Sequence, residues 1–197
     1  MRIFYAVTFE DYVKSAMQNN IPEIKKYTLR ANFTPQENFH ATLLFIGEIA
    51  ENQLELFKNI ADTAADKIKN LNLQSVSATI DGLGSFARPG EELLWVGLKT
   101  EPDNILQQLN TALIETINCN GIKIKESGKQ SFTPHITIAR KVEFWRMSGK
   151  DIYQIKFEPV KCEINSITLM ESIQLTDSRT RRTKVIYKPL HETKFTV

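Results

Sequence analysis

Two short segments of the chain hold reactive residues in the same frame. They are "FHATLLFIG" at 39–47 and "PHITIAR" at 134–140, and each has a histidine followed two places later by a threonine. The chain has three histidines: His40 and His135 lie in these segments, and His191 stands apart. Because side chains alternate between the two faces of a strand, residues i and i+2 share a face. Each segment therefore predicts a strand that presents an imidazole and a hydroxyl on one face and buries the other.

The buried faces of both strands are expected to be wholly apolar. Their expected members are Phe39, Ala41, Leu43 and Phe45 in the first strand, and Pro134, Ile136 and Ile138 in the second. A single histidine on a strand is most often a core residue with satisfied polar atoms, but a second matched pair is hard to explain by packing.

Zinc needs three or four protein ligands. No cysteine or further histidine lies at ligand spacing near either motif, so no metal site is expected, and His191 is expected to be a surface residue.

Two imidazoles facing each other suit acid–base chemistry at phosphorus. Histidine has an unperturbed pKa of about 6.5, so near neutral pH one can accept a proton while the other donates one. The hydroxyls of Thr42 and Thr137 can donate to non-bridging phosphate oxygens, and Arg140 is the nearest candidate for a bidentate clamp. Strict alternation, however, places Arg140 on the face opposite His135. It reaches the histidine face only if the strand ends or bulges near Ala139.

The remaining pattern indicates alternating strands and helices. The expected strands are 2–9, 74–86 with a bend at its glycines, 93–99, 153–175 and 183–190. The expected helices are 10–30 with a break at Pro22, 51–71, and 101–121 with Pro102 near its first turn and Gly121 just past its end. A strand, a helix and a His-x-Thr strand follow one another in 2–47 and again in 93–140. This repetition suggests a duplication, in which two lobes each present one histidine and one threonine to a shared cleft.

Size and composition set the wider limits. A chain of 197 residues with 42% hydrophobic residues suits one domain or two small lobes sharing a core. The net charge of +2 argues against an overwhelmingly basic surface, although a local basic region remains possible. The two cysteines, Cys119 and Cys162, form no disulfide framework, and no uncharged apolar run approaches the ~20 residues of a membrane helix. We therefore expect a cytoplasmic monomer that does not engage a membrane.

At the two motifs the sequence resembles the 2H phosphoesterase superfamily. More narrowly, it is similar to the bacterial and archaeal RNA 2′,3′-cyclic phosphodiesterases, historically called 2′-5′ RNA ligases. The segments that carry the resemblance are "RIFYAV", "ENFHATLLFIGEI", "LLWVGL", "FTPHITIAR" and "LMESIQL". One departure is the loop "TDSRTRRTKV", where the family often has a glycine-containing loop and a tyrosine. Its Arg179, Arg181 and Arg182 form either a solvated hairpin loop or a basic edge that touches RNA phosphates.

The resemblance implies a single α+β domain over 1–197. It would be bilobal, with two antiparallel sheets and outer helices flanking a central cleft around a pseudo-twofold axis. It also implies opening of the 2′,3′-cyclic phosphate of an RNA end or a cyclic nucleotide to a 2′-phosphomonoester, without metal or cofactor. His135 would be the base on water and His40 the acid on the departing ribose oxygen. The substrate-binding residues would be Thr42, Thr137, Arg140, Phe86 and Phe132, where the two phenylalanines either stack on a terminal base or pack in the core.

Two other functions fit the same motifs. The first is RNA ligation as the main activity, with an RNA 5′-hydroxyl in place of water. The second is a non-catalytic module that binds RNA or nucleotides on this fold. Pure binding does not require two poised imidazoles, so the intact motifs favour an enzyme.

Overall fold

The computed structural model describes residues 1–88, 91–123, 132–145, 151–176 and 183–197. The helices are α1 (Asp11–Gln18), α2 (Ile21–Lys25), α3 (Leu54–Lys69) and α4 (Ile105–Cys119), with short 3-10 helices at Gln36–Asn38, Glu51–Gln53 and Asp151–Gln154. The strands are β1 (Arg2–Thr8), β2 (Thr28–Phe33), β3 (His40–Glu48), β4 (Ser77–Arg88), β5 (Glu91–Glu101), β6 (His135–Phe144), β7 (Val160–Glu163), β8 (Ser166–Thr176) and β9 (Thr183–Lys194). Arg179, Arg181 and Arg182 lie outside the described residues, so neither interpretation of their loop is tested.

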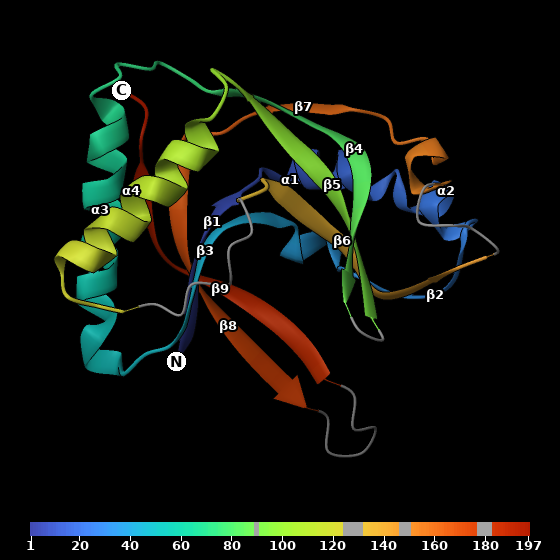
Figure 1. Cartoon of the computed structure of the whole chain (residues 1–197), viewed down its shortest axis with the longest axis horizontal. Helices are drawn as coiled ribbons and strands as arrows, with labels where there is room; N and C mark the ends of the chain where they lie inside the picture. The colour runs from blue at the N-terminus through green and yellow to red at the C-terminus, as the bar shows by residue number, and fades with distance from the viewer. Residues whose placement is uncertain (89–90, 124–131, 146–150, 177–182) are drawn as a thin grey trace.

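The described strands form one curled antiparallel sheet with a few helices around it (Figure 1). Its order is β7-β4-β5-β6-β3-β1-β8-β9, and β2 pairs with β6. The expected mixed fold with antiparallel strands is confirmed. The expectation of two separate sheets is wrong, because β3 and β6 join the two halves through the pair Ala41–Ile136.

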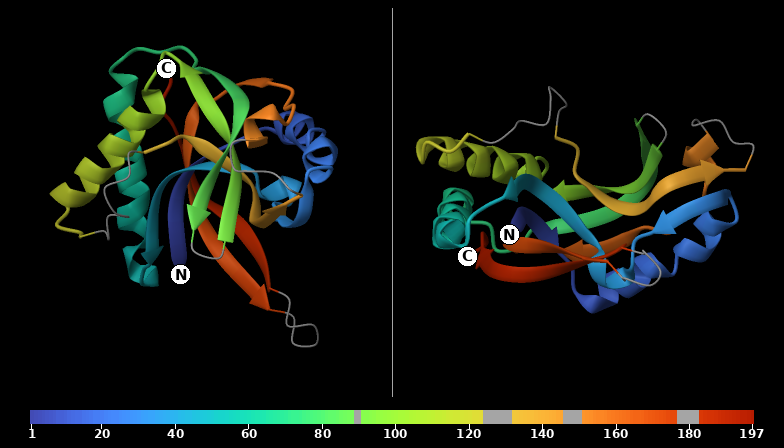
Figure 2. Two further views of the ribbon diagram at one scale, coloured as in Figure 1. Left: turned by 45° about the vertical axis from the view of Figure 1, so that its right-hand side comes forward. Right: turned by 90° about the horizontal axis from the view of Figure 1, so that it is seen from below.

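The helices gather at two ends of the sheet. α3 and α4 lie side by side, α3 against β8 and β9, and α4 against β3 and β5. α1 and α2 lie at the other end, where α1 contacts β7 and α2 contacts β2 (Figure 2). The apolar stripe expected for 51–71 is present in α3, which buries Phe57, Ile60, Ala61, Ala64 and Ile68.

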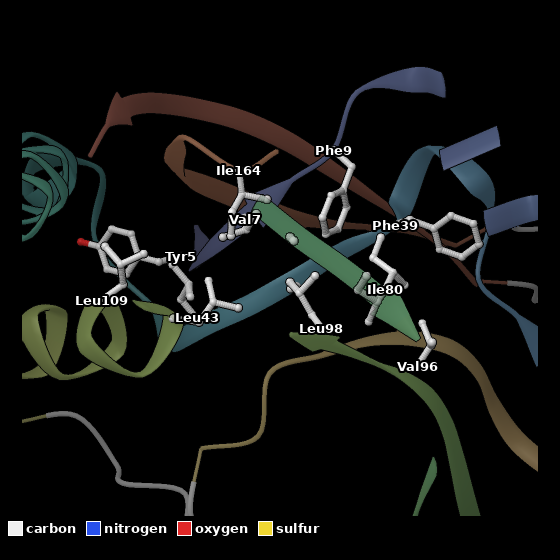
Figure 3. Close-up of a cluster of buried hydrophobic side chains, with 14 of the residues drawn as sticks. Tyr5, Val7, Phe9, Phe39, Leu43, Ile80, Val96, Leu98, Leu109 and Ile164 are labelled. Carbon is white, nitrogen blue, oxygen red and sulfur yellow. The ribbon is translucent and has the colours of Figure 1, made fainter. Parts of the chain in front are cut away.

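The main hydrophobic core lies on one face of β1 and the histidine motifs lie on the other. Ile3, Tyr5 and Val7 belong to the main core, whereas Phe4 and Ala6 belong to a small separate cluster with Met170. Side chains of β1, β3, β4 and β5 fill the main core together with Leu109 of α4 (Figure 3). The hydroxyl of the fully buried Tyr5 donates to the carbonyl oxygen of Phe57 at 2.6 Å, which ties β1 to α3. Burying one large apolar side chain stabilises a fold by about 1.5–3 kcal/mol, so this face anchors the sheet.

Three expected elements differ from the structure. Residues 10–30 were expected to be helical, but the helices end at Lys25 and residues 28–33 form β2 on the edge of β6. Pairing with β6 here outweighs the local helical pattern. The helix expected over 101–121 begins only at Ile105, so Pro102, expected near its first turn, lies three residues before it, and Asn104 at the N-cap is left-handed (φ 66°). The segment 153–175 is not one strand but a 3-10 turn followed by β7 and β8. Gly121 lies just past the end of α4 as expected, with φ +71°.

Candidate active site

His40 opens β3 and is held by two hydrogen bonds. Its Nδ1 donates to the carbonyl oxygen of Asn38 at 2.7 Å, and its Nε2 lies 3.2 Å from the Thr42 hydroxyl. Since a carbonyl oxygen can only accept, the proton of the neutral ring is on Nδ1 and Nε2 carries the lone pair. The ring also packs against Phe4, at 5.0 Å between centroids, and against Tyr187 at 4.7 Å. The expected shared face of His40 and Thr42 is therefore present.

The surroundings of His40 disfavour its charged form. Burial lowers its pKa to about 4, against the opposing effect of the Asn38 hydrogen bond. Electrostatic interaction with Arg140 and His135 lowers the pKa further. At neutral pH, His40 is a neutral imidazole with an available lone pair.

His135 opens β6 in a closely similar setting. Its Nδ1 donates to the carbonyl oxygen of Thr133 at 2.8 Å, again two residues earlier in the chain. Its ring meets Phe86 edge-on at 5.0 Å and Trp95 at 6.0 Å between centroids. Phe86, expected near the histidines, is thus in contact with one of them. In both motifs a preceding carbonyl fixes the tautomer and aromatic rings hold the imidazole.

The pairing of β3 with β6 brings the two histidines together. Ala41 and Ile136 face each other in the register, and both are buried. Their neighbours His40 and His135 point to the opposite face, because side chains alternate along each strand. Two residues 95 positions apart in the sequence therefore flank one backbone pair.

A β-bulge in β6 decides the position of Arg140. Thr137 pairs with Trp95 and Ala139 with Leu94, so Ile138 is an extra residue in the ladder. Ile138 and Ala139 are consecutive and both fully buried, and Arg140 then returns to the exposed side. The bulge restores Arg140 to the face of His135 and Thr137, which is the condition that the sequence required.

A matching bulge in β3 corrects one expectation. The register passes from Ala6–Thr42 to Tyr5–Leu44, so Leu43 is the extra residue. Phe45, expected on the buried face, instead pairs with Phe4 on the histidine face and is 46% exposed. The Arg2 guanidinium lies over its ring, 4.8 Å from the centroid. The earlier residues expected to be buried, Phe39, Ala41 and Leu43, are buried.

A cavity of about 250 Å³ adjoins His40. Thr8, Asn38, Thr168 and Tyr187 contribute to its walls. A larger hollow of about 710 Å³ lies over β4, β5 and β7 and contains none of the predicted site residues. The chemistry suggested by the motifs therefore belongs to the histidine face rather than to this larger hollow.

Some residues of this site were not predicted from the sequence, and others lie elsewhere than expected. Tyr187 touches His40, and its signal was the alternation of "KVIYKPL", in which it shares a face with Val185 and Pro189. Asn38 and Thr133 act through backbone carbonyls, which carry no side-chain signal. Phe132 is half-buried against the main core and has no described contact with either histidine. His191 was expected to be an isolated surface residue, but its Nε2 lies 2.7 Å from Asp62 on α3.

Two kinds of feature are absent from the described part of the chain. Among these residues, no group of three histidine, cysteine, aspartate or glutamate side chains could hold a metal ion. No helix of this part is long and apolar enough to cross a membrane.

The curled antiparallel sheet is shared with solved structures that are described below. The chain belongs to the 2′-5′ RNA ligase superfamily, whose family model matches residues 14–174. The resemblance seen in the motifs is thereby confirmed at the level of the family.

Individual relatives agree with this assignment. An RNA 2′,3′-cyclic phosphodiesterase of Thermotoga maritima is 29% identical over 99% of this chain and 96% of its own. One from Aquifex aeolicus is 30% identical over 83% of this chain and 87% of its own. Among solved structures, Escherichia coli LigT complexed with 3′-AMP is similar with a TM-score of 0.67 and 20% identity, over 98% of this chain and 97% of its own. A Thermus thermophilus protein reaches a TM-score of 0.71 at 21% identity, over 99% of this chain and 98% of its own.

Proposed function

We propose that this protein hydrolyses the 2′,3′-cyclic phosphate of RNA ends to a 2′-phosphomonoester. The observation that carries the proposal is the matched pair of imidazoles, His40 and His135, on one face beside the Ala41–Ile136 pair. The names of the curated relatives support the same substrate class. The release of a 2′-phosphate rests on the family resemblance.

The proposed unit is one bilobal domain over 1–197 that acts as a cytoplasmic monomer. Each half of the sheet contributes one motif, and a pseudo-twofold axis passes between Ala41 and Ile136. The matching bulges at Leu43 and Ile138, each three residues after a histidine, support this symmetry.

The proposed roles of the histidines rest on the lowered pKa of His40. His40 is neutral in the free protein, so its Nε2 takes the proton from water while the water oxygen attacks phosphorus. The bond from phosphorus to O3′ breaks, and protonated His135 gives its Nε2 proton to O3′. This assignment reverses the one expected from the resemblance. The physical reason is that burial makes His40 a poor carrier of the proton that an acid must donate.

The phosphate is held by neutral and charged donors of the same face. The hydroxyls of Thr42 and Thr137 and the guanidinium of Arg140 donate to its non-bridging oxygens. Arg140 supplies the fixed positive charge, so the proposed step uses neither metal nor cofactor. Phe86, which packs on His135, offers an aromatic edge to the terminal base.

Ligation is a second candidate activity, because the same groups can activate an RNA 5′-hydroxyl in place of water. Any catalyst of opening also catalyses closing. In aqueous solution, water is far more concentrated than any RNA 5′-hydroxyl, so hydrolysis is favoured over ligation.

Incubation with a short RNA that ends in a 2′,3′-cyclic phosphate tests the proposal. We expect a product heavier by one water, and phosphorus NMR should show a 2′-phosphate. His40→Ala and His135→Ala should each reduce turnover by about 10²–10⁴-fold. His191→Gln is the matched control, since it removes the third histidine and should leave turnover unchanged. Binding of the RNA without any change in mass would point to a binding module instead, and joined RNA would point to a ligase.

A further inference from the structure

Phe45 and Arg2 form an exposed aromatic and cationic pair on the histidine face. The register places Thr8 opposite His40, Ala6 opposite Thr42, and Phe4 opposite Phe45. Directly paired residues of an antiparallel sheet lie on the same face. Phe45 is therefore in line with His40 and Thr42, although simple alternation predicted the reverse.

The distance from the reacting centre suits a neighbouring nucleotide. Ala6 and Phe4 mark the positions of Thr42 and Phe45 on β1, and they are two residues apart. At about 3.3 Å per residue, Phe45 lies roughly 7 Å further along the sheet than Thr42. Stacked bases are about 3.4 Å apart along one strand, so roughly 7 Å corresponds to two stacked steps or to one step of a splayed strand.

The chemistry of the pair suits a base and its phosphate. Phe45 is 46% exposed, so part of its ring is open to a planar partner. Arg2 is also exposed, and its guanidinium lies 4.8 Å from the ring centroid. Glu48 lies opposite Arg2 in the register. Its carboxylate lies 3.8 Å from the Met1 amino group, so it already has a cationic partner other than Arg2. A base can stack on Phe45 while Arg2 meets the adjoining phosphate, as in sequence-tolerant binding of single strands.

We propose that Phe45 and Arg2 bind the nucleotide that precedes the cyclic phosphate end of the RNA. This inference rests on the proposed function. It predicts that the protein prefers an oligonucleotide with a cyclic phosphate end over a cyclic mononucleotide, which cannot reach the pair.

The test compares kcat/KM for a trinucleotide ending in a 2′,3′-cyclic phosphate with kcat/KM for the cyclic mononucleotide. Wild-type protein should favour the trinucleotide. Phe45→Ala should reduce the ratio of the two values by about 5- to 100-fold, the effect expected for one base stack. Arg2→Met should reduce the ratio too, and the double variant should lose less than the product of the two effects. Effects on the shared chemistry cancel in the ratio.

Tyr12→Ala is the matched control. Tyr12 is an exposed aromatic residue of α1 that lines the larger hollow, and its removal should leave the ratio unchanged. An unchanged ratio in Phe45→Ala, or no wild-type preference, would overturn the inference while leaving the proposed function intact. If wild type converts neither substrate, the proposed function fails. Binding of a fluorescent trinucleotide 2′-phosphate then decides: weaker binding by Phe45→Ala than by Tyr12→Ala supports the subsite, and equal binding refutes it.

Discussion

The depressed pKa of His40 makes a quantitative prediction about stability. The pKa falls from 6.5 to about 4 on folding, chiefly because the ring is removed from water. The unfolded chain therefore binds a proton between these two values, where the folded protein does not. Stability is fully present above about pH 6.5 and is lost as the pH falls toward about 4. At about 1.4 kcal/mol per pKa unit, the whole window corresponds to about 3 kcal/mol.

The perturbation that isolates this contribution is His40→Gln, which cannot take up the proton. We would measure the free energy of unfolding of both proteins by urea denaturation at about pH 7.5 and about pH 4.5. All other titrating groups are common to the two proteins and cancel in the comparison. The stability difference should move by about 2.5 kcal/mol in favour of the variant at the lower pH, since pH 4.5 does not reach the end of the window.

Two outcomes would refute the reasoning. One is a parallel loss of stability in the two proteins, with a difference that stays constant within about 0.5 kcal/mol. The other is an NMR titration in which the His40 ring protonates near its ordinary value of about 6.5. Either result would mean that Phe4 and Tyr187 do not enclose the ring against water.

Four further predictions concern activity. Arg140→Lys keeps the charge but loses the bidentate clamp, so kcat/KM should fall about ten- to hundredfold, and wild-type kinetics would contradict the clamp. A Cβ at Gly84 would clash with the Trp95 ring, so Gly84→Ala should lower the free energy of unfolding by about 1–3 kcal/mol in a thermal melt. It should also reduce kcat, because Trp95 packs on His135. An unchanged melting curve would show that the ring is free to move. The residual kcat/KM of His135→Ala should keep an acidic limb near pH 4, from His40, and lose its alkaline limb, whereas loss of the acidic limb would exchange the two roles. Turnover should persist in excess EDTA, and its loss with recovery on adding a divalent cation would contradict the proposed step.

The sequence predicts the site well where strict alternation holds. His40 and Thr42 share a face because nothing interrupts the strand between them, and their contact at 3.2 Å follows from that. Alternation fails at the bulges. Neither Leu43 nor Ile138 is distinguished in type from its neighbours, yet each reverses the faces of the residues that directly follow it. The sequence could therefore state the condition for Arg140 to join the site, but not whether it is met.

The fold shows the same division between local and long-range information. The stripe of α3 depends on residues close in sequence and was predicted correctly. The strand β2 was missed because its pairing partner, β6, lies more than 100 residues away and local propensity favoured a helix. Tyr187 likewise reaches His40 only through the order of β9, β8 and β1 in the sheet.

The single pair Ala41–Ile136 has a mechanical consequence. Among the described residues, this is the one backbone pair that joins β3 to β6. Any relative tilt of the two halves of the sheet would therefore turn about this pair. Points close to a pivot move least, and the two histidines are the immediate neighbours of the pivot. A tilt would therefore change the gap between the two imidazoles less than the separation of β7 and β9, the strands at the two edges of the sheet.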